Sequence, residues 1–262
     1  SQTETDRQIR IFGSHPYPFY FETMKKHIPN MITCCNLISG CVATTMAFNG
    51  NIKWAVAWMI IGAVFDFFDG MTARLLHVSS PIGKELDSLA DDVTFGVAPS
   101  TILFWQLGVI EYPGFLEGLR PVLPYAAYVM AAFSALRLAK FNLDTRQTTS
   151  FIGLPTPANA LFWGSLILCC EPWIESGKYG VIILLILLAV SCFLLICELP
   201  MFALKFKQWG WKGNEVKYVF AATSLVLLLI FGFLQAWWII IALYLIVSIV
   251  IWMRSHNHMQ QA

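Results

Sequence analysis

The sequence predicts an all-α membrane protein, a polytopic helical bundle with about eight transmembrane helices. Hydrophobic residues fill 57% of the 262 positions and charged residues 13%, whereas about 25% of the residues in a soluble domain are charged. The mean hydropathy of the chain is +0.64. Apolar runs long enough to cross a bilayer recur along the chain, and lysine and arginine gather in alternate connections between them. These three observations exclude an ordinary soluble domain.

Eight apolar runs have the length of a membrane span, which is about 20 residues. In chain order the expected spans are 30–48, 53–73, 84–107, 122–142, 156–173, 179–198, 215–233 and 236–253. We expect them to form one membrane domain over residues 24–262, with the active site built on residues 30–160. Residues 1–23 differ in composition from the rest and are interpreted as an N-terminal extension or an expression remnant.

The distribution of positive charge predicts the orientation. An even number of spans puts both termini on one side, and twelve lysines and arginines fall in the segments on that side. The segments on the other side contain only Lys53, Arg120 and Lys178. Because cytoplasmic loops are enriched in lysine and arginine, we expect both termini to be cytoplasmic. The formal net charge is only +1, so the composition does not indicate a nucleic-acid partner.

Two predicted spans carry carboxylates inside apolar sequence. Asp66 and Asp69 are three residues apart, and Asp87 and Asp91 are four apart, so each pair shares one face of its helix. Four unpaired aspartates at the centre of a membrane would cost on the order of 10 to 14 kcal/mol. That cost is comparable with the whole stability of a typical protein, about 5 to 15 kcal/mol, so something must neutralise them. Asp92, one step round the helix from Asp91, is interpreted as a residue of the rim or as one that supports the ligands from behind.

Divalent cations would neutralise these carboxylates. Two ions balance four negative charges, and a ligand set made only of oxygen favours Mg²⁺, Mn²⁺ or Ca²⁺ over zinc. Paired metals about 3.5 to 4 Å apart are typical of sites that transfer phosphoryl groups. The alternatives are ion pairing with basic residues and an ion pathway in a cation transporter, since transporters also carry intramembrane acids. Small residues beside the acids, Gly70, Ala73 and Gly83, leave room for a ligand and favour the metal site.

The segment from Asp66 to Asp91 reads D-x-x-D-G-x-x-A-R, then eight residues, then G-x-x-x-D-x-x-x-D. This pattern resembles, at each fixed position and spacing, the signature of the CDP-alcohol phosphotransferase family of membrane enzymes. The resemblance implies the fold of that family, a homodimer, and two divalent cations, Mg²⁺ or Mn²⁺, held by Asp66, Asp69, Asp87 and Asp91. It also implies that Asp91 is the general base that takes the proton of the acceptor hydroxyl.

The resemblance further implies which positions hold the donor, CDP-diacylglycerol. They are Asn30, Thr33, Asp69, Gly70, Ala73, Arg74 and Gly83. The small residues of this set would make space for the cytidine nucleotide, and Arg74 would support the site. Asn30 and Thr33 open the first predicted span, so we also expect them to cap that helix.

Four further stretches resemble the small integral-membrane phosphatidylserine synthases of bacteria. They are KKHIPNMITCCNLISG (25–40), SALRLAKFNLD (134–144), FIGLPTPANA (151–160) and ELPMFALKF (198–206). The resemblance covers residues 25 to about 210, and it implies transfer of the phosphatidyl group to L-serine, with release of CMP, in a bacterial inner membrane. Lys140 stands where those enzymes have arginine, which keeps the charge and loses the bidentate contact.

A serine acceptor carries a carboxylate and an ammonium, so its pocket needs a fixed cation. Arg137 is the first candidate and Lys140 the second, and Asn142 can orient either group. For both basic residues the alternative is a charge at a helix end that sets the topology. Glycerol 3-phosphate and inositol phosphate are alternative acceptors, although their doubly charged phosphates favour a denser basic cluster. The sequence thus predicts an enzyme whose partners are CDP-diacylglycerol, L-serine, membrane lipid and a second copy of itself.

Overall fold

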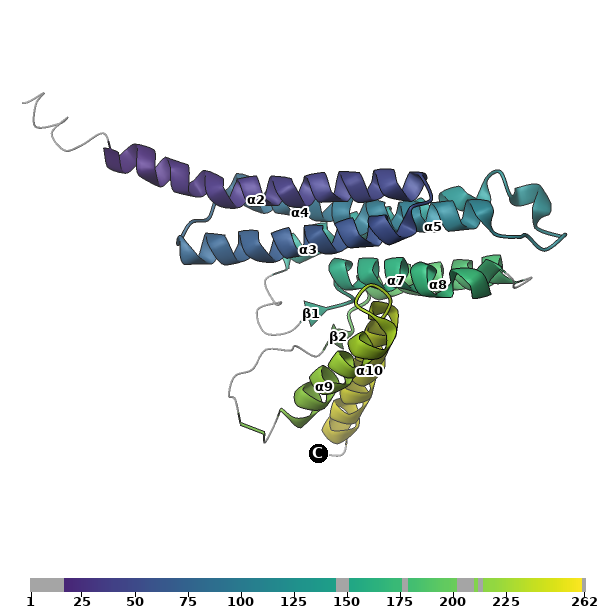
Figure 1. Cartoon of the computed structure of the whole chain (residues 1–262). Helices are drawn as coiled ribbons and strands as arrows, with labels where there is room; N and C mark the ends of the chain where they lie inside the picture. Colours follow the sequence, from purple (N-terminus) through teal and green to yellow (C-terminus); the bar gives the residue numbers. More distant parts are fainter. Residues whose placement is uncertain (1–16, 145–150, 176–178, 202–209, 212–213, 261–262) are drawn as a thin grey trace, which may run out of the picture.

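In the computed structural model the described residues are 17–144, 151–175, 179–201, 210–211 and 214–260. They form helices and one short pairing of two strands (Figure 1). In chain order the elements are α2 (Tyr17–Phe48), α3 (Ile52–Leu75), α4 (Pro81–Asp91), η1 (Asp92–Val97), α5 (Ala98–Val109), η2 (Glu117–Leu119), η3 (Leu123–Tyr128), α6 (Val129–Leu143), β1 (Phe151–Ile152), α7 (Thr156–Glu175), α8 (Gly180–Ile196), β2 (Pro200–Met201), α9 (Glu215–Phe231) and α10 (Trp237–Gln260). The predicted all-α class is confirmed.

Helices overlap the predicted spans, and among the described residues two of them qualify as membrane spans by length and composition. These two are His27–Phe48 and Ile52–Leu75. Within the described residues, Thr156–Cys169, Gly180–Ile196 and Trp237–Met253 are shorter apolar helices. The third predicted span is divided into α4, the π-helix η1 and α5. The presence of eight membrane crossings therefore stays a prediction.

The first helix begins before the predicted membrane domain. Residues 1–16 lie outside the described part of the chain, and α2 runs from Tyr17 through Met24 without a break. Asn30 and Thr33 consequently lie inside this helix, and the expectation that they cap it is wrong. Their polar side chains are available for contacts with other helices instead.

Glycines allow α2 and α3 to approach the π-helix closely. A Cβ atom on Gly40 would lie 2.8 Å from Thr94 Cα, and one on Gly62 would lie 2.6 Å from Thr94 Cγ2. Small residues at such crossings let helix backbones come together in membrane proteins. Thr94 Oγ1 also donates a hydrogen bond to the Asn36 carbonyl oxygen at 3.0 Å. These contacts fix the aspartate-bearing helices against α2.

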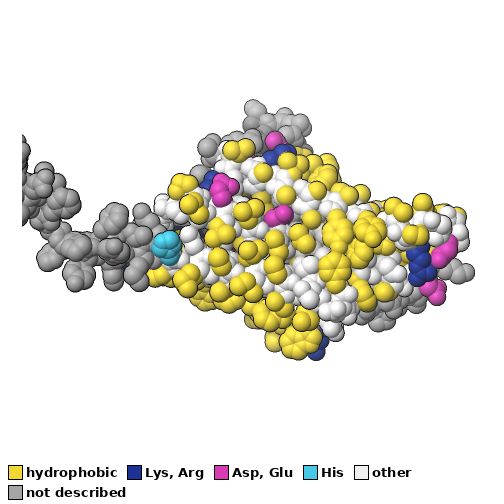
Figure 2. Space-filling model, turned by 90° about the horizontal axis from the view of Figure 1, so that it is seen from above, with side chains coloured by type: hydrophobic (Ala, Val, Ile, Leu, Met, Phe, Trp, Pro, Cys, Tyr) yellow, Lys and Arg dark blue, Asp and Glu magenta, His cyan; other side chains and the backbone are white. Residues whose placement is uncertain are grey.

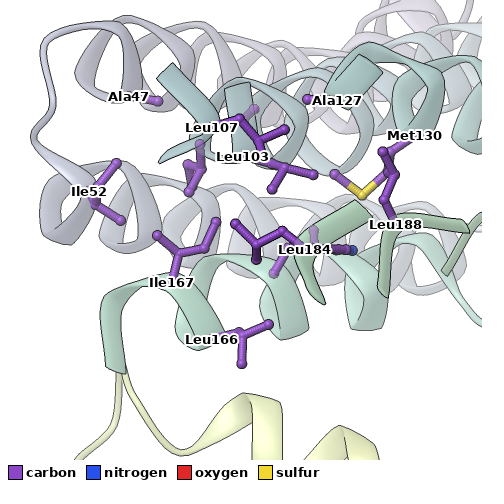
Figure 3. Packing of buried hydrophobic residues seen from close by; sticks show 14 of the residues in the cluster. Ala47, Ile52, Leu103, Leu107, Ala127, Met130, Leu166, Ile167, Leu184 and Leu188 are labelled. Carbon is purple, nitrogen blue, oxygen red and sulfur yellow. The ribbon is translucent and has the colours of Figure 1, made fainter. Parts of the chain in front are cut away.

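The main apolar core lies between α2, α3, α5, α6, α7 and α8. Ile52, Leu103, Met130, Ile167 and Leu184 point into the same interior from five of these helices (Figure 3). Ile167, Leu103 and Met130 have no exposed surface. Close packing of side chains drives the association of helices in a membrane, so this core holds together the part of the bundle that lies away from the aspartates.

The last two helices form a separate hairpin. In Figure 1, α9 and α10 run across the direction of α2 and α3, and α10 packs against α7. A smaller apolar cluster of Leu154, Met201 and Ile241 joins this hairpin to the two strands. Large hydrophobic side chains also cover the outer surface shown in Figure 2, as expected of a surface that faces lipid.

Candidate active site

Three of the four predicted metal ligands lie together where α3 and α4 face each other. One carboxylate oxygen each from Asp66, Asp69 and Asp87 lies within 4.8 Å of the other two. Asp69 is 5% exposed, and the other two are half-buried. Oxygen ligands at this spacing fit a hard divalent cation such as Mg²⁺ or Mn²⁺. The donor set of the described residues is therefore suited to a metal.

Thr33 orients Asp69 from the neighbouring helix. Its Oγ1 donates to Asp69 Oδ2 at 2.6 Å and lies 3.0 Å from the Pro29 carbonyl oxygen of its own helix. Thr33 is 3% exposed. A hydrogen bond from a buried hydroxyl to a carboxylate is short and strong, so Thr33 fixes the rotamer of one predicted ligand.

Asn36 holds Asp91 in a corresponding way. Its Nδ2 donates to Asp91 Oδ1 at 3.0 Å, and Asn36 itself is fully buried. Asn36 is not among the residues that the sequence motif predicts for the site. The signal was present, because Asn30, Thr33 and Asn36 recur every three residues and so share one face of an otherwise apolar helix. That face is the one turned toward the aspartates.

The π-helix begins immediately after Asp91. Turns of this kind are rare and are frequent at functional sites. A Cβ atom on Gly96 would lie 2.6 Å from Asp92 Oδ1 and 3.1 Å from Ser134 Cβ, so only glycine lets η1 approach α6 this closely. Among the described residues Asp92 Oδ1 and Ser134 Oγ have no hydrogen-bond partner and are inaccessible to solvent. Asp92 is thus turned toward α6 rather than exposed at the rim.

A cleft of about 270 Å³ opens beside the aspartate cluster, and we call it the first cleft. Its lining residues are Pro29, Asn30, Thr33, Asp69, Gly70, Ala73, Val78, Ser79, Ser80, Gly83, Lys84 and Asp87. Six of the seven residues predicted to bind the donor are among them. The exception is Arg74, which is exposed in the last turn of α3 and does not line this cleft.

The glycines of the first cleft serve different purposes. No atom lies within 4 Å of the position a Cβ on Gly70 would take, so open space remains there for a ligand. At Gly83 a Cβ would lie 2.9 Å from Ser80 Oγ and 3.0 Å from Asn30 Oδ1. Ser80 caps α4 by accepting a hydrogen bond from the Gly83 amide at 2.9 Å. A side chain at Gly83 would therefore disturb both the cap and Asn30.

A second cleft of about 380 Å³ contains two of the three residues predicted to bind serine. Its lining residues are Arg137, Lys140, Phe141, Leu143, Asp144, Ile152, Leu195, Ile196, Cys197 and Glu198. Arg137 is 7% exposed, and its guanidinium lies 5.7 Å from the centre of the Phe141 ring. Asp91 is near enough for its charge to act on Arg137.

Asn142 is not in the second cleft. Its Nδ2 donates to Ser88 Oγ at 2.7 Å, and its carbonyl oxygen accepts a hydrogen bond from Lys84 Nζ at 2.9 Å. Since Asn142 lies five residues beyond Arg137, it projects from a different side of α6. The structure thus places Asn142 as a link between the end of α6 and α4.

Comparisons with known proteins are consistent with this geometry. Residues 26–199 match the family described as CDP-alcohol phosphatidyltransferase. Three similar proteins are each named CDP-diacylglycerol–serine O-phosphatidyltransferase. The one from Bacillus subtilis (strain 168) is 43% identical over 131 residues, covering 50% of this chain and 70% of that protein. The one from Helicobacter pylori (strain J99) is 33% identical over 236 residues, covering 86% and 90%. The one from Mycobacterium tuberculosis (strain H37Rv) is 32% identical over 163 residues, covering 58% and 54%.

Proposed function

The chain belongs to the CDP-alcohol phosphatidyltransferase family, and from this premise we infer that it transfers the phosphatidyl group of CDP-diacylglycerol to the hydroxyl of L-serine. The products are phosphatidylserine and CMP. The observation that carries the acceptor assignment is the similarity to the Helicobacter enzyme over 86% of this chain. The clustered carboxylates of Asp66, Asp69 and Asp87 agree with the chemistry of the family.

The first cleft is the proposed site of the donor nucleotide. Asn30 and Thr33 enter it from α2, and Gly70 and Ala73 from α3, so a CDP group would lie between these two helices with its pyrophosphate toward Asp69. Gly83 completes the wall from α4. We keep Arg74 as a residue of the donor site because the family motif includes this position, and we expect it to support the site from the end of α3.

We propose that Asp66, Asp69, Asp87 and Asp91 hold two divalent cations, Mg²⁺ or Mn²⁺. When bound, such ions would polarise the pyrophosphate and stabilise the negative charge that develops on departing CMP. Thr33 and Asn36 keep Asp69 and Asp91 oriented for this task. Precise orientation matters because carboxylate ligands work only within a narrow geometry.

Asp91 is the proposed general base. The serine hydroxyl attacks the phosphorus that bears diacylglycerol, its proton passes to Asp91, and the bond between that phosphorus and the CMP oxygen breaks. A serine hydroxyl is a weak nucleophile, so proton removal during attack accelerates the step. The burial of Asp91 at 9% exposure limits competing reaction with water.

Arg137 is the proposed partner of the serine carboxylate. It lines the second cleft, and the charge of Asp91 acts on it, so we expect a serine bound to Arg137 to lie near the base. Lys140 adds a second positive charge on the same cleft. Asn142 contributes indirectly, because its contacts with Ser88 and Lys84 hold this end of α6 against α4.

The membrane arrangement completes the proposal. We expect eight crossings in the bacterial inner membrane, both termini in the cytoplasm, contact with membrane lipid, and a homodimer. With this orientation the aspartate cluster lies near the cytoplasmic surface, where a water-soluble acceptor meets a lipid-bound donor. Residues 24–262 would then act as one membrane domain.

An acceptor panel tests the proposed function. Purified protein is given CDP-diacylglycerol, Mn²⁺ and labelled serine, glycerol 3-phosphate or inositol phosphate in separate reactions. The expected result is CMP release and labelled lipid with serine. Release of CMP only with glycerol 3-phosphate would reject the serine assignment, and no release with any acceptor would reject transferase activity altogether.

A further inference from the structure

The second cleft contains charged side chains of both signs. Arg137 and Lys140 enter it from α6, and Asp144 and Glu198 from the segments that follow α6 and α8. Among the described lining residues the formal charges therefore cancel. A doubly negative phosphate gains no net attraction from such a cleft, whereas a zwitterion finds a cation for its carboxylate and an anion for its ammonium.

Arg137 is built into this cleft as a fixed cation with unused binding capacity. It is 7% exposed, and its Nε has no hydrogen-bond partner among the described residues. The contact of its guanidinium with the Phe141 ring, which lines the same cleft, restricts its position. A buried donor without a hydrogen-bond partner is unfavourable. A ligand with a carboxylate oxygen would supply the hydrogen-bond acceptor that Arg137 lacks.

Glu198 lies on a different wall of the cleft, in the link between α8 and β2. Backbone hydrogen bonds fix this link, since the Gly153 amide donates to the Leu199 carbonyl oxygen at 2.9 Å and the Leu154 amide to that of Leu194 at 2.9 Å. Gly153 has φ +73°, and a Cβ there would lie 2.9 Å from the Cys197 carbonyl oxygen, so the two segments are in direct contact. The position of Glu198 relative to α6 is therefore set by backbone structure.

We propose that Glu198 binds the ammonium group of the amino-acid acceptor while Arg137 binds its carboxylate, and that this pair selects a zwitterion over other hydroxyl compounds. The inference rests on the proposed transferase function and adds a residue that determines the acceptor. Asp144 is less suited to the role, because it caps the same helix that carries the two basic residues, with its amide donating to the Lys140 carbonyl oxygen at 3.0 Å. Glu198 enters the cleft from a different segment than Arg137, so a ligand can lie between the two side chains.

The test compares two acceptors that differ by one group. 3-Hydroxypropionate has the hydroxyl and the carboxylate of serine and lacks the ammonium. In the wild-type protein, kcat/KM for serine should exceed that for 3-hydroxypropionate at least tenfold. Glu198→Gln should raise KM for serine about tenfold, leave kcat and KM for CDP-diacylglycerol unchanged, and leave 3-hydroxypropionate unaffected. Glu198→Asp keeps the charge and should recover part of the serine affinity.

Glu85→Gln is the matched control. Glu85 is an exposed acid on α4 that lines neither cleft, and the same change of charge there should alter none of these constants. A Glu198→Gln variant that loses the same factor with both acceptors would overturn the proposal, as would a wild-type protein that does not distinguish them. The wild-type reaction with serine is measured first, so failure of the transferase function itself is recognised before any variant is compared.

Discussion

Asn36→Leu tests whether the buried contact between α2 and Asp91 is needed for turnover. The substitution keeps the approximate size of the side chain and removes the Nδ2 donor that lies 3.0 Å from Asp91 Oδ1. Asn36 is fully buried, so water does not replace the lost donor easily. The hydrogen bond from Thr94 to the Asn36 carbonyl oxygen is a backbone contact and remains.

The expected loss of rate follows from the negative charge of Asp91, which accepts this hydrogen bond. A hydrogen bond to a charged group contributes about 1.5–3 kcal/mol, and each 1.36 kcal/mol of activation free energy corresponds to about tenfold in rate. If the contact orients Asp91 during proton removal, kcat should fall about 10- to 100-fold. KM for CDP-diacylglycerol should change little, because Asn36 does not line the first cleft.

The measurement is steady-state release of CMP by purified variants, with thermal unfolding as a check that the fold is intact. Ser39→Ala is the matched control, since Ser39 lies one turn further along the same helix, is 1% exposed, and its hydroxyl bonds the Cys35 carbonyl oxygen of its own helix at 2.8 Å. It should retain nearly full turnover. An Asn36→Leu protein with the wild-type kcat would refute the orienting role.

Four further predictions concern the two clefts and the aspartate cluster. Thr33→Val removes the hydroxyl that lies 2.6 Å from Asp69 Oδ2 and should raise the Mn²⁺ concentration for half-maximal activity about tenfold; a superimposable metal titration would contradict this. Asp91→Asn should abolish turnover while calorimetry still detects metal binding, and a normal rate would remove Asp91 as the base. Gly83→Val should raise KM for CDP-diacylglycerol and not for serine, because a Cβ there would lie 3.0 Å from Asn30 Oδ1; Gly108→Ala, where nothing lies within 4 Å, is its control. Arg137→Ala should raise KM for serine far more than KM for the donor, and equal effects would indicate a structural role.

The acids and the first cleft could be predicted from the sequence because their positions are encoded locally. Asp66, Asp69 and Asp87 come from fixed spacings on two consecutive helices, and helical periodicity converts those spacings directly into faces. The same holds for Gly70 and Ala73, which lie beside the acids on α3. Only the short connection 76–80 separates α3 from α4, so the motif residues of the two helices lie close together.

The supporting contacts could not be predicted, because they depend on how distant helices meet. Asn36 reaches Asp91 only because Gly40 and Gly62 let α2 and α3 approach the π-helix. Asn142 reaches Ser88 only because the end of α6 lies against α4. Neither contact follows from a local pattern. The expected cap at Asn30 failed for a related reason, since the helix extends into residues whose composition suggested a separate segment.

The π-helical turn at Asp92–Val97 sets how the faces of the helices on its two sides are aligned. Its backbone hydrogen bonds reach five residues back instead of four, so the turn holds about one residue more than an α-helical turn. If the same residues were wound as a regular α-helix, the part after Val97 would be rotated by about 100° relative to Asp91. Either Asp91 would then turn away from Asn36, or Ile102 and Leu103 would turn out of the core. The wider turn absorbs the extra residue and keeps both contacts, so the winding of this segment is as much a requirement of the site as the identity of its aspartates.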